Sequence, residues 1–126
     1  MKRGWIALAM IALSLVLGGI EYIYVTSNAD AYVKMLDDAD EKIAHNLVYE
    51  AESAAERLDN RFRKQSGIFN IFMYHSEMEH ISCDLAMLRR YAQTGATADF
   101  LATSACAKRE ILAIRDRKAL KWENIF

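Results

Sequence analysis

Apolar residues recur at steps of three and four over most of the chain, the spacing that gives an α-helix one buried face. The first of these stripes comprises Tyr32, Leu36, Ala39, Ile43, Leu47, Ala51, Ala54, Leu58 and Phe62. It is consistent with one helix from Ser27 to about Gln65, and equally with two helices that break at His45 and Asn46. Either arrangement predicts a long helical face that packs against other helices.

A second stripe follows Ser66 and Gly67, which are predicted to end the preceding helix. It comprises Ile71, Tyr74, Met78, Ile81, Leu85, Leu88 and Ala92. The polar loop 93–97, with a glycine suited to a helix C-terminus, comes next. A last helix is predicted over about 98–119, with an apolar side of Phe100, Leu101, Ala105, Ile111 and Leu112. Because the loop is short, the last two helices are predicted to form an antiparallel hairpin.

The first 25 residues lack this periodicity, because they are almost entirely apolar. After the first three residues, seventeen carry no charge, and the apolar run then continues past one acid, Glu21. A bilayer core of about 30 Å needs about 20 helical residues to cross it. We therefore predict a membrane anchor in residues 1–25, with its single span at 4–25, and a helical bundle domain in residues 26–126.

The charges that flank the span predict its direction. Lys2 and Arg3 precede the uncharged run, whereas Glu21 and Asp30 are the first charges after it. The positive-inside rule therefore places the N-terminus in the cytoplasm and the C-terminal domain outside the cytoplasmic membrane. The alternative is a signal peptide, which would be cleaved near Ala29 and Ala31 and would leave a secreted protein. That tripeptide lies some ten residues beyond the apolar core, which favours an uncleaved anchor.

Composition supports an all-α fold. The chain has no proline, only five glycines and many residues that favour helices. We predict an N-terminal transmembrane helix followed by a small antiparallel bundle of helical hairpins. The net charge of −1 does not indicate a nucleic-acid partner.

The charges are unevenly distributed along the chain. Residues 28–60 carry nine acids and three bases, whereas residues 61–126 carry eleven bases and seven acids. This asymmetry predicts that the two parts pack together and partly neutralise each other. The alternative is an acidic face and a basic face that are available to a partner.

The stretch FMYHSEMEHI, residues 72–81, holds two histidines and two glutamates within six positions. On a helix, His75 and Glu79 share one flank, and Glu77 and His80 share the other. The two histidines are then too far apart around the axis to hold one metal ion together. We interpret them as members of Glu–His pairs on an exposed helix. The alternative is a catalytic centre of these histidines and Glu77, but no other constellation indicates an enzyme, so we predict no catalysis, no metal and no cofactor.

Two cysteines, Cys83 and Cys106, lie in the predicted last hairpin. Both fall opposite the apolar stripe of their own helix. Packed helix axes are about 8–10 Å apart, whereas a disulfide needs Cα atoms within about 7 Å. We therefore predict free thiols, which could join two copies into a homo-oligomer if they are exposed.

The segment HSEMEHISCDLAMLRRY, residues 75–91, together with the closing WENIF, resembles the domain-of-unknown-function 4363 family of bacterial proteins. Its members are similarly short and have an N-terminal membrane segment. The family tends to place a tryptophan before the second stripe, where this chain reads RKQSGIFNIF. The resemblance implies an anchored helical protein with no assigned reaction, substrate or catalytic residue. It also suggests a structural role for the matching motif residues, which are His75, Ser76, Glu77, Asn124, Ile125 and Phe126.

The C-terminus carries three large apolar residues, Trp122, Ile125 and Phe126. They are predicted to fold back over the open end of the bundle, and the alternative is a docking peptide for a partner. Together, these patterns predict a non-enzymatic, single-pass membrane protein whose extracytoplasmic bundle binds another protein as an interaction or scaffold module. The alternative is a ligand- or metal-binding sensory module that acts through a membrane partner.

Overall fold

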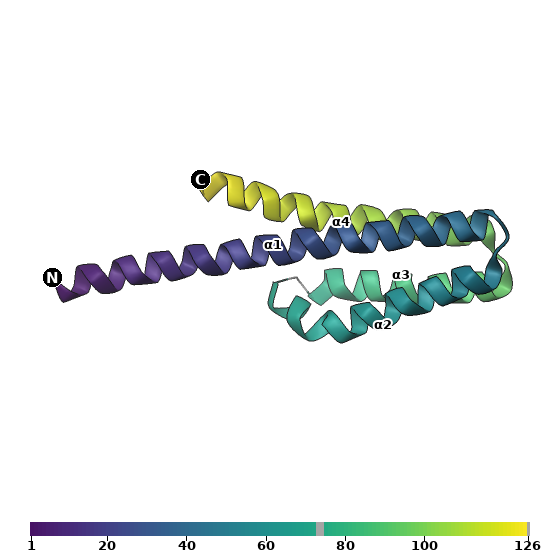
Figure 1. The fold of residues 1–126 in the computed structure, drawn as a ribbon, viewed down its shortest axis with the longest axis horizontal. Coiled ribbons are helices and arrows are strands. Elements are labelled where there is room, and N and C mark those ends of the chain that lie inside the picture. The colour runs from purple at the N-terminus through teal and green to yellow at the C-terminus, as the bar shows by residue number, and fades with distance from the viewer. Residues whose placement is uncertain (73–74, 126) are drawn as a thin grey trace.

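The described part of the chain consists of α-helices joined by short turns (Figure 1). In this computed structural model the backbone is described for residues 1–72 and 75–125, and side chains are described for all of these except 69–72, 122 and 125. The helices are α1 (Lys2–Ala44), α2 (Val48–Phe72), α3 (His75–Thr94) and α4 (Thr97–Ile125). The predicted all-α fold is confirmed.

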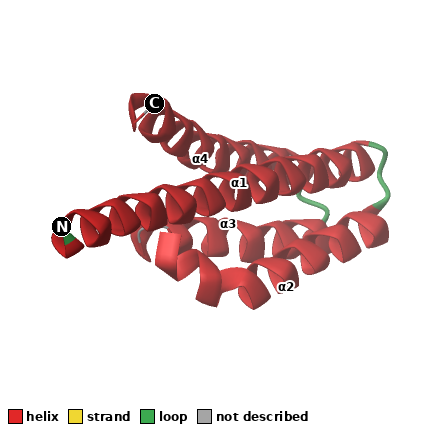
Figure 2. Cartoon of the chain, turned by 60° about the vertical axis from the view of Figure 1, so that its left-hand side comes forward, coloured by secondary structure: helices red, strands yellow, loops and turns green. Residues whose placement is uncertain are grey.

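The helices form an antiparallel bundle in which each helix packs on two others. α1 contacts α2 and α4, and α3 contacts the same two helices (Figures 1 and 2). Each of these neighbours runs in the opposite direction along the bundle, as short connections require. The predicted hairpin of the last two helices is therefore confirmed, and the chain before it forms a second hairpin from the C-terminal half of α1 and from α2.

The two described turns close the same end of the bundle and use the same backbone motif. After α1, the N–H of Leu47 donates to the carbonyl oxygen of Lys42 at 2.9 Å, and Asn46 has a positive φ of 62°. After α3, the N–H of Ala96 donates to the carbonyl oxygen of Tyr91 at 2.9 Å, and Gly95 has a φ of 69°. Asparagine and glycine are the residues that adopt this left-handed conformation most readily at helix ends. Of the two alternatives for residues 27–65, the break at His45 and Asn46 is therefore the observed one.

Two predicted helix ends are wrong. α2 continues through Ser66 and Gly67 to Phe72, because a glycine costs an exposed helix only about 1 kcal/mol and no proline follows it. α4 likewise continues past residue 119 to Ile125. The C-terminal backbone therefore does not fold back over the bundle, as the sequence had suggested, but extends away from it as helix (Figure 1).

The predicted stripes form the core, with a few exceptions. The buried apolar residues of α1, α2 and α3 include those of the first two stripes together with Val25, Ala29 and Ala55, which the stripes missed, but Leu47 lies in the turn and is exposed. Ile71 and Tyr74 lie outside the described side chains. In α4 the buried positions are Phe100, Ser104, Ala107, Ile111 and Ile114. Ala105 was predicted to be buried but is exposed. The buried stripe runs through its neighbour Ser104 instead, which a search for apolar residues does not select because serine is polar.

α1 is much longer than the bundle requires. Its 43 residues span about 65 Å at 1.5 Å per residue. Its buried positions begin only at Val25, and its first half extends beyond the bundle with apolar side chains exposed. Among the described residues, α1 is the helix long and apolar enough to cross a membrane, which is consistent with an anchor or a signal sequence. No break in the helix marks the predicted domain boundary between residues 25 and 26.

Candidate functional site

The His-Ser-Glu motif opens α3 at the end of the bundle from which the apolar segment of α1 extends (Figure 1). His75 Nε2 lies 2.9 Å from Glu79 Oε1, one helical turn away, so this predicted pair is confirmed. Both side chains are largely exposed, as is Ser76. An exposed pair of this kind stabilises a helix by only a few tenths of a kcal/mol. The pair therefore adds little to the stability of the bundle.

Glu77 has a different role from the one predicted for it. It forms an ion pair with Arg117 of α4 rather than serving only as a partner of His80 on its own helix. The Glu77 side chain is half-buried between α3 and α4, so the contact links the start of α3 to the far part of α4. This contact supports the hypothesis that the family motif fixes the packing of α3 on its neighbour.

Further titratable groups surround this ion pair on the α3–α4 face. Burial raises the pKa of the Asp84 carboxyl, although the nearby His80 opposes the shift. Burial also raises the pKa of Glu110, and the charges of Asp84 and Glu77 add to this rise while His80 lowers it. One Glu110 oxygen is buried without a hydrogen-bond partner. In the sequence, Glu77, His80 and Asp84 are recognisable only as an i, i+3, i+7 series on α3. Glu110 lies on α4 and comes near them only in the folded bundle.

This arrangement does not assemble the catalytic or metal centre that we considered as an alternative. His75 is paired with Glu79, whereas Glu77 faces α4. Over residues 1–72 and 75–125, no group of three or more His, Cys, Asp or Glu side chains is placed to hold a metal ion. The absence of an enzymatic activity nevertheless stays a prediction.

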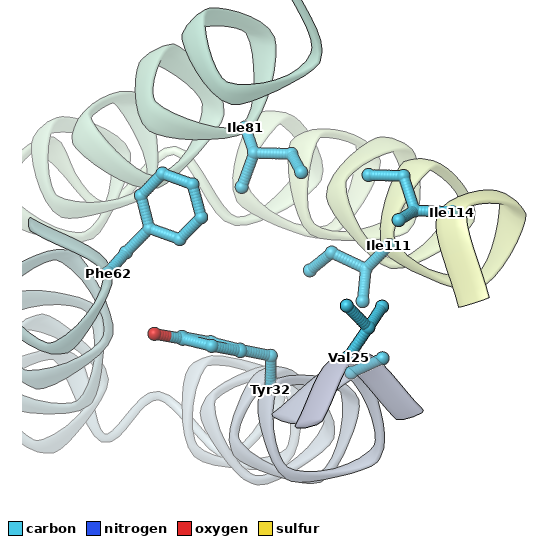
Figure 3. Close-up of a pocket in the computed structure, with 7 residues that line it drawn as sticks. Val25, Tyr32, Phe62, Ile81, Ile111 and Ile114 are labelled. Atoms are coloured by element: carbon cyan, nitrogen blue, oxygen red, sulfur yellow. The ribbon is translucent and has the colours of Figure 1, made fainter. Parts of the chain in front are cut away.

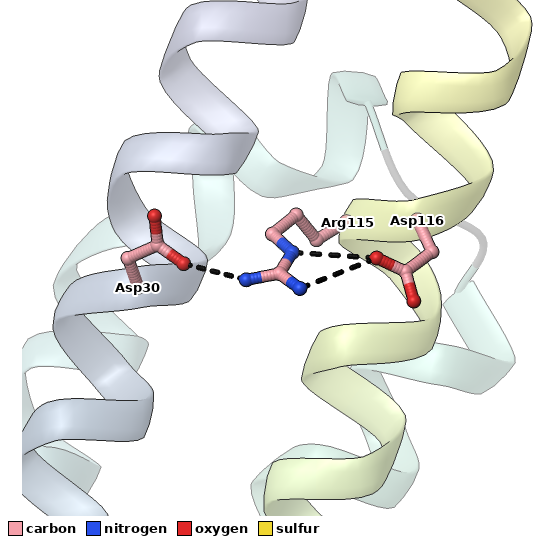
Figure 4. A network of polar contacts seen from close by, with 3 residues as sticks. All are labelled: Asp30, Arg115 and Asp116. Carbon is pink, nitrogen blue, oxygen red and sulfur yellow. Dashed lines mark hydrogen bonds and ion pairs between the residues drawn. The ribbon is translucent and has the colours of Figure 1, made fainter.

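A series of ion pairs joins α4 to α1, on the side of α4 that faces α1. Lys108 Nζ lies 2.8 Å from an oxygen of Asp37 and 2.7 Å from an oxygen of Asp40. Two turns further along α4, Arg115 Nη1 lies 2.9 Å from Asp30 (Figure 4). Asp116 accepts two further hydrogen bonds from Arg115, at 3.3 and 3.4 Å.

Lys118 continues this series and pairs with Glu21, the acid that interrupts the apolar run of α1. The acidic first part of the chain and its basic second part therefore meet across the α1–α4 contact. The prediction that the two parts neutralise each other is confirmed for these residues. The same contact shows that α4 reaches the level of the apolar segment of α1.

A polar network ties α1 to α2 near the same level. The hydroxyl of Tyr32 donates to Gln65 Oε1 at 2.6 Å, and Gln65 Nε2 donates to Asn28 Oδ1 at 3.0 Å. Arg61 lies over the Tyr32 ring, 5.2 Å from its centroid, at cation–π distance. Burial raises the pKa of Tyr32, while the Arg61 charge opposes the rise, so the hydroxyl stays protonated at neutral pH. A network of hydrogen-bonded polar groups such as this one orients the helices that it joins.

All four helices line a small apolar cavity beside this network. Its wall is formed by Val25, Ala29, Tyr32, Phe62, Ile81, Ile111 and Ile114 (Figure 3). The volume of about 30 Å³ corresponds to about one water molecule. Pockets for organic ligands measure about 300–1,000 Å³, so this cavity is a packing gap and not a ligand site.

The two cysteines are exposed and free, which confirms the prediction for their thiols. Cys83 lines an open groove between α2 and α3 together with His75 and Glu79. Cys106 lies on α4, and its side chain faces solvent. Of the C-terminal motif residues, Asn124 is exposed, Ile125 lies outside the described side chains and Phe126 lies outside the described residues.

Comparison with known proteins identifies a family for this chain. A family model described as a domain of unknown function, DUF4363, matches residues 20–125. No curated protein and no solved structure matches the chain. The matched range begins inside the apolar segment of α1 and contains the whole bundle.

Proposed function

Because this chain belongs to the DUF4363 family, whose description assigns no activity, we propose its function from the geometry alone. It is a non-enzymatic, single-pass membrane protein whose helical bundle stands outside the cytoplasmic membrane and binds another protein. The bundle acts as an interaction or scaffold module at a fixed position relative to the bilayer.

The observation that carries this proposal is the continuity of α1. One uninterrupted helix supplies the apolar N-terminal segment and also the core residues from Val25 to Ile43. A flexible linker would let the bundle move freely above the membrane, whereas a continuous helix holds its orientation. The α1–α4 ion pairs brace this helix at the point where it leaves the bundle. A rigid attachment of this kind suits a module that presents one surface at a fixed distance from the bilayer.

We expect both thiols to react with a membrane-impermeant maleimide added to intact cells that express the full chain. Cys83 and Cys106 are exposed and free, so no reducing agent is needed. The positive-inside rule places them outside the membrane, because Lys2 and Arg3 precede the span. The label is read on a gel of the membrane fraction, at the mass of the full-length chain.

A variant with both cysteines replaced by serine is the control for background labelling. Labelling that requires cell lysis would contradict the proposed orientation, since burial of the thiols does not explain a failure to react. Label in the medium, on a shortened chain, would show that the apolar segment is a cleaved signal sequence.

The end of the bundle farthest from the anchor offers a surface for a protein partner. Leu47 lies in the α1–α2 turn and Tyr49 in the first turn of α2, and their side chains are 44% and 87% exposed. Large apolar and aromatic side chains of this kind are enriched where proteins meet, and charged residues are depleted there. We propose that the partner is a different protein that contacts this tip.

A photo-crosslinking amino acid at position 49 is expected to give a discrete, light-dependent adduct in intact cells. The same amino acid at position 60, an exposed asparagine on the flank of α2, is the matched control and is expected to give none. Equal yields at both positions, or no adduct at position 49, would contradict a partner at the tip. An adduct of twice the mass of the chain would identify a second copy and contradict a different protein.

The alternative function, a sensory module with a ligand in its core, is less well supported. The cavity that all four helices share has the volume of one water molecule. The groove beside His75 is open to solvent and does not enclose a ligand. A scaffold or interaction role agrees better with both features.

A further inference from the structure

α4 extends beyond α2 and α3 at the end of the bundle where α1 becomes the apolar segment (Figure 1). The ion pair between Lys118 and Glu21 shows that α4 still lies beside α1 at this level. The helical backbone then continues for seven more residues, to Ile125. The last turns of α4 therefore lie beside the segment that we propose as the anchor, and not beside the bundle.

The two helices diverge over this stretch (Figures 1 and 2). An open groove lies between them. On the α1 side the groove is lined by Ser14, Leu17, Gly18, Glu21 and Tyr22. On the α4 side it is lined by Lys118 and Lys121. The α1 wall thus carries one acid among uncharged residues, and the α4 wall carries two bases.

The composition of this end of α4 is that of a helix at a membrane surface. Leu120 is 58% exposed, because neither α2 nor α3 lies beside this part of α4 to cover it (Figure 1). Lys118 and Lys121 flank it, and residues 122–126 hold three large apolar residues, Trp122, Ile125 and Phe126, and one acid, Glu123. Tryptophan and other apolar residues with neighbouring lysines are enriched at the membrane interface, where the apolar parts enter the lipid and the ammonium groups reach the headgroups.

The depth agrees with such a location. If Glu21 and Lys118 lie at the headgroup level of the outer leaflet, positions 122 and 125 lie about 6 and 10 Å nearer the acyl chains, at 1.5 Å per residue. A headgroup layer is about 5–8 Å thick, so position 122 then lies near the border between headgroups and acyl chains. Pairing with Lys118 also neutralises Glu21 where the apolar run would otherwise carry a free charge to the lipid.

We propose that the end of α4, residues 118–125, is a second membrane contact that lies in the interface of the outer leaflet. It binds lipid and is not a docking peptide for a protein. Two helices would then hold the bundle, which fixes its rotation as well as its distance from the bilayer. This inference rests on the proposed membrane anchor, which must be tested separately.

The two tryptophans of the chain allow that separation. The full chain with Trp5→Phe reports on Trp122 alone, and the full chain with Trp122→Phe reports on Trp5 alone. Each is reconstituted into phosphatidylcholine–phosphatidylglycerol vesicles with and without brominated acyl chains, which quench tryptophan fluorescence on contact. We expect Trp122 to lose most of its emission to lipids brominated near the headgroup and less to lipids brominated near the chain end.

Trp5 is expected to be quenched in every case in which the anchor is inserted. Quenching of Trp5 without quenching of Trp122 would overturn the second contact and leave the anchor intact. If neither Trp5 nor Trp122 were quenched, the anchor and the second contact would both be overturned. Quenching of Trp122 by aqueous iodide, with no response to brominated lipid, would show the tail free in water, as a docking peptide would be.

Discussion

Replacing Phe100 by alanine is expected to lower the free energy of unfolding by about 3–5 kcal/mol. Phe100 has no exposed surface and is among the largest fully buried side chains of the described core. It lies one turn into α4, next to the α3–α4 turn, so its loss leaves a cavity where that hairpin closes. For a domain of about 100 residues, a change of this size lowers the melting temperature by more than about 10 °C.

Tyr49→Ala is the matched control, because it also removes an aromatic ring but from a side chain that is 87% exposed. Its effect is expected to stay within about 0.5 kcal/mol. Thermal unfolding of both variants, followed by circular dichroism of the full chain in detergent, makes the comparison. Equal losses in the two variants would contradict the placement of Phe100 in the core.

Replacing Lys108 by methionine is expected to cost about 1.5–3 kcal/mol, the range for hydrogen bonds to charged groups. Lys108 bridges Asp37 and Asp40 across the α1–α4 contact. Methionine keeps the apolar part of the side chain but leaves the Asp40 carboxylate, which is only 18% exposed, without its cation. One Asp40 oxygen already lacks a hydrogen-bond partner, so the surrounding structure offers this carboxylate little to replace the lysine.

Lys42→Met is the control for this substitution. The two lysine side chains have similar exposure, 26% for Lys42 and 23% for Lys108, but the Lys42 side chain forms an ion pair with Asp38 on its own helix. Removing such an i, i+4 pair is expected to cost about 0.3–0.5 kcal/mol. If Lys42→Met destabilised the chain as much as Lys108→Met, the bridge between helices would not be the source of the loss.

The stabilisation by Lys108 should also depend on pH in one direction. Burial alone lowers the pKa of Lys108, but the hydrogen bonds and charges of Asp37 and Asp40 outweigh it and raise the pKa. A raised pKa means that the stabilisation is complete below the unfolded value of about 10.4 and is lost as the pH rises through the folded value. The difference between the original chain and Lys108→Met should therefore be constant near neutral pH and shrink above about pH 10. Ionisation of Tyr32 also destabilises the fold at high pH, but it affects both chains and cancels in the difference.

The candidate site could be predicted from the sequence only in part. The His75–Glu79 pair follows from spacing on one helix, because i, i+4 neighbours meet wherever the helix forms. The contact of Glu77 with Arg117 joins residues forty positions apart, and no local rule selects Arg117 among the bases of α4. The same holds for Glu110, whose raised pKa depends on its burial against α3.

By itself, the sequence determined the elements that depend on local spacing: the helices, most of their apolar faces, the turn at Gly95, and the long apolar stretch at the N-terminus. Those features arise from residues within a few positions of one another, so periodicity and turn chemistry are sufficient. The sequence left open whether the helix breaks at His45 and Asn46, because the apolar stripe continues across that point. It misplaced the ends of α2 and α4, because where a helix ends depends on small differences that packing overrides.

Only the tertiary structure decided which charges meet and where the C-terminus lies. The acidic and basic parts of the chain could have faced each other or a partner, and the α1–α4 ion pairs select the first arrangement. Ser104 is buried because it lies between Phe100 and Ala107 on the face that meets the other helices, although its own polarity favours water. The tail extends beside the apolar segment because α4 packs antiparallel to α1 and is longer than α2 and α3. Relative helix lengths and pairing are properties of the assembled bundle, and no single stripe contains them.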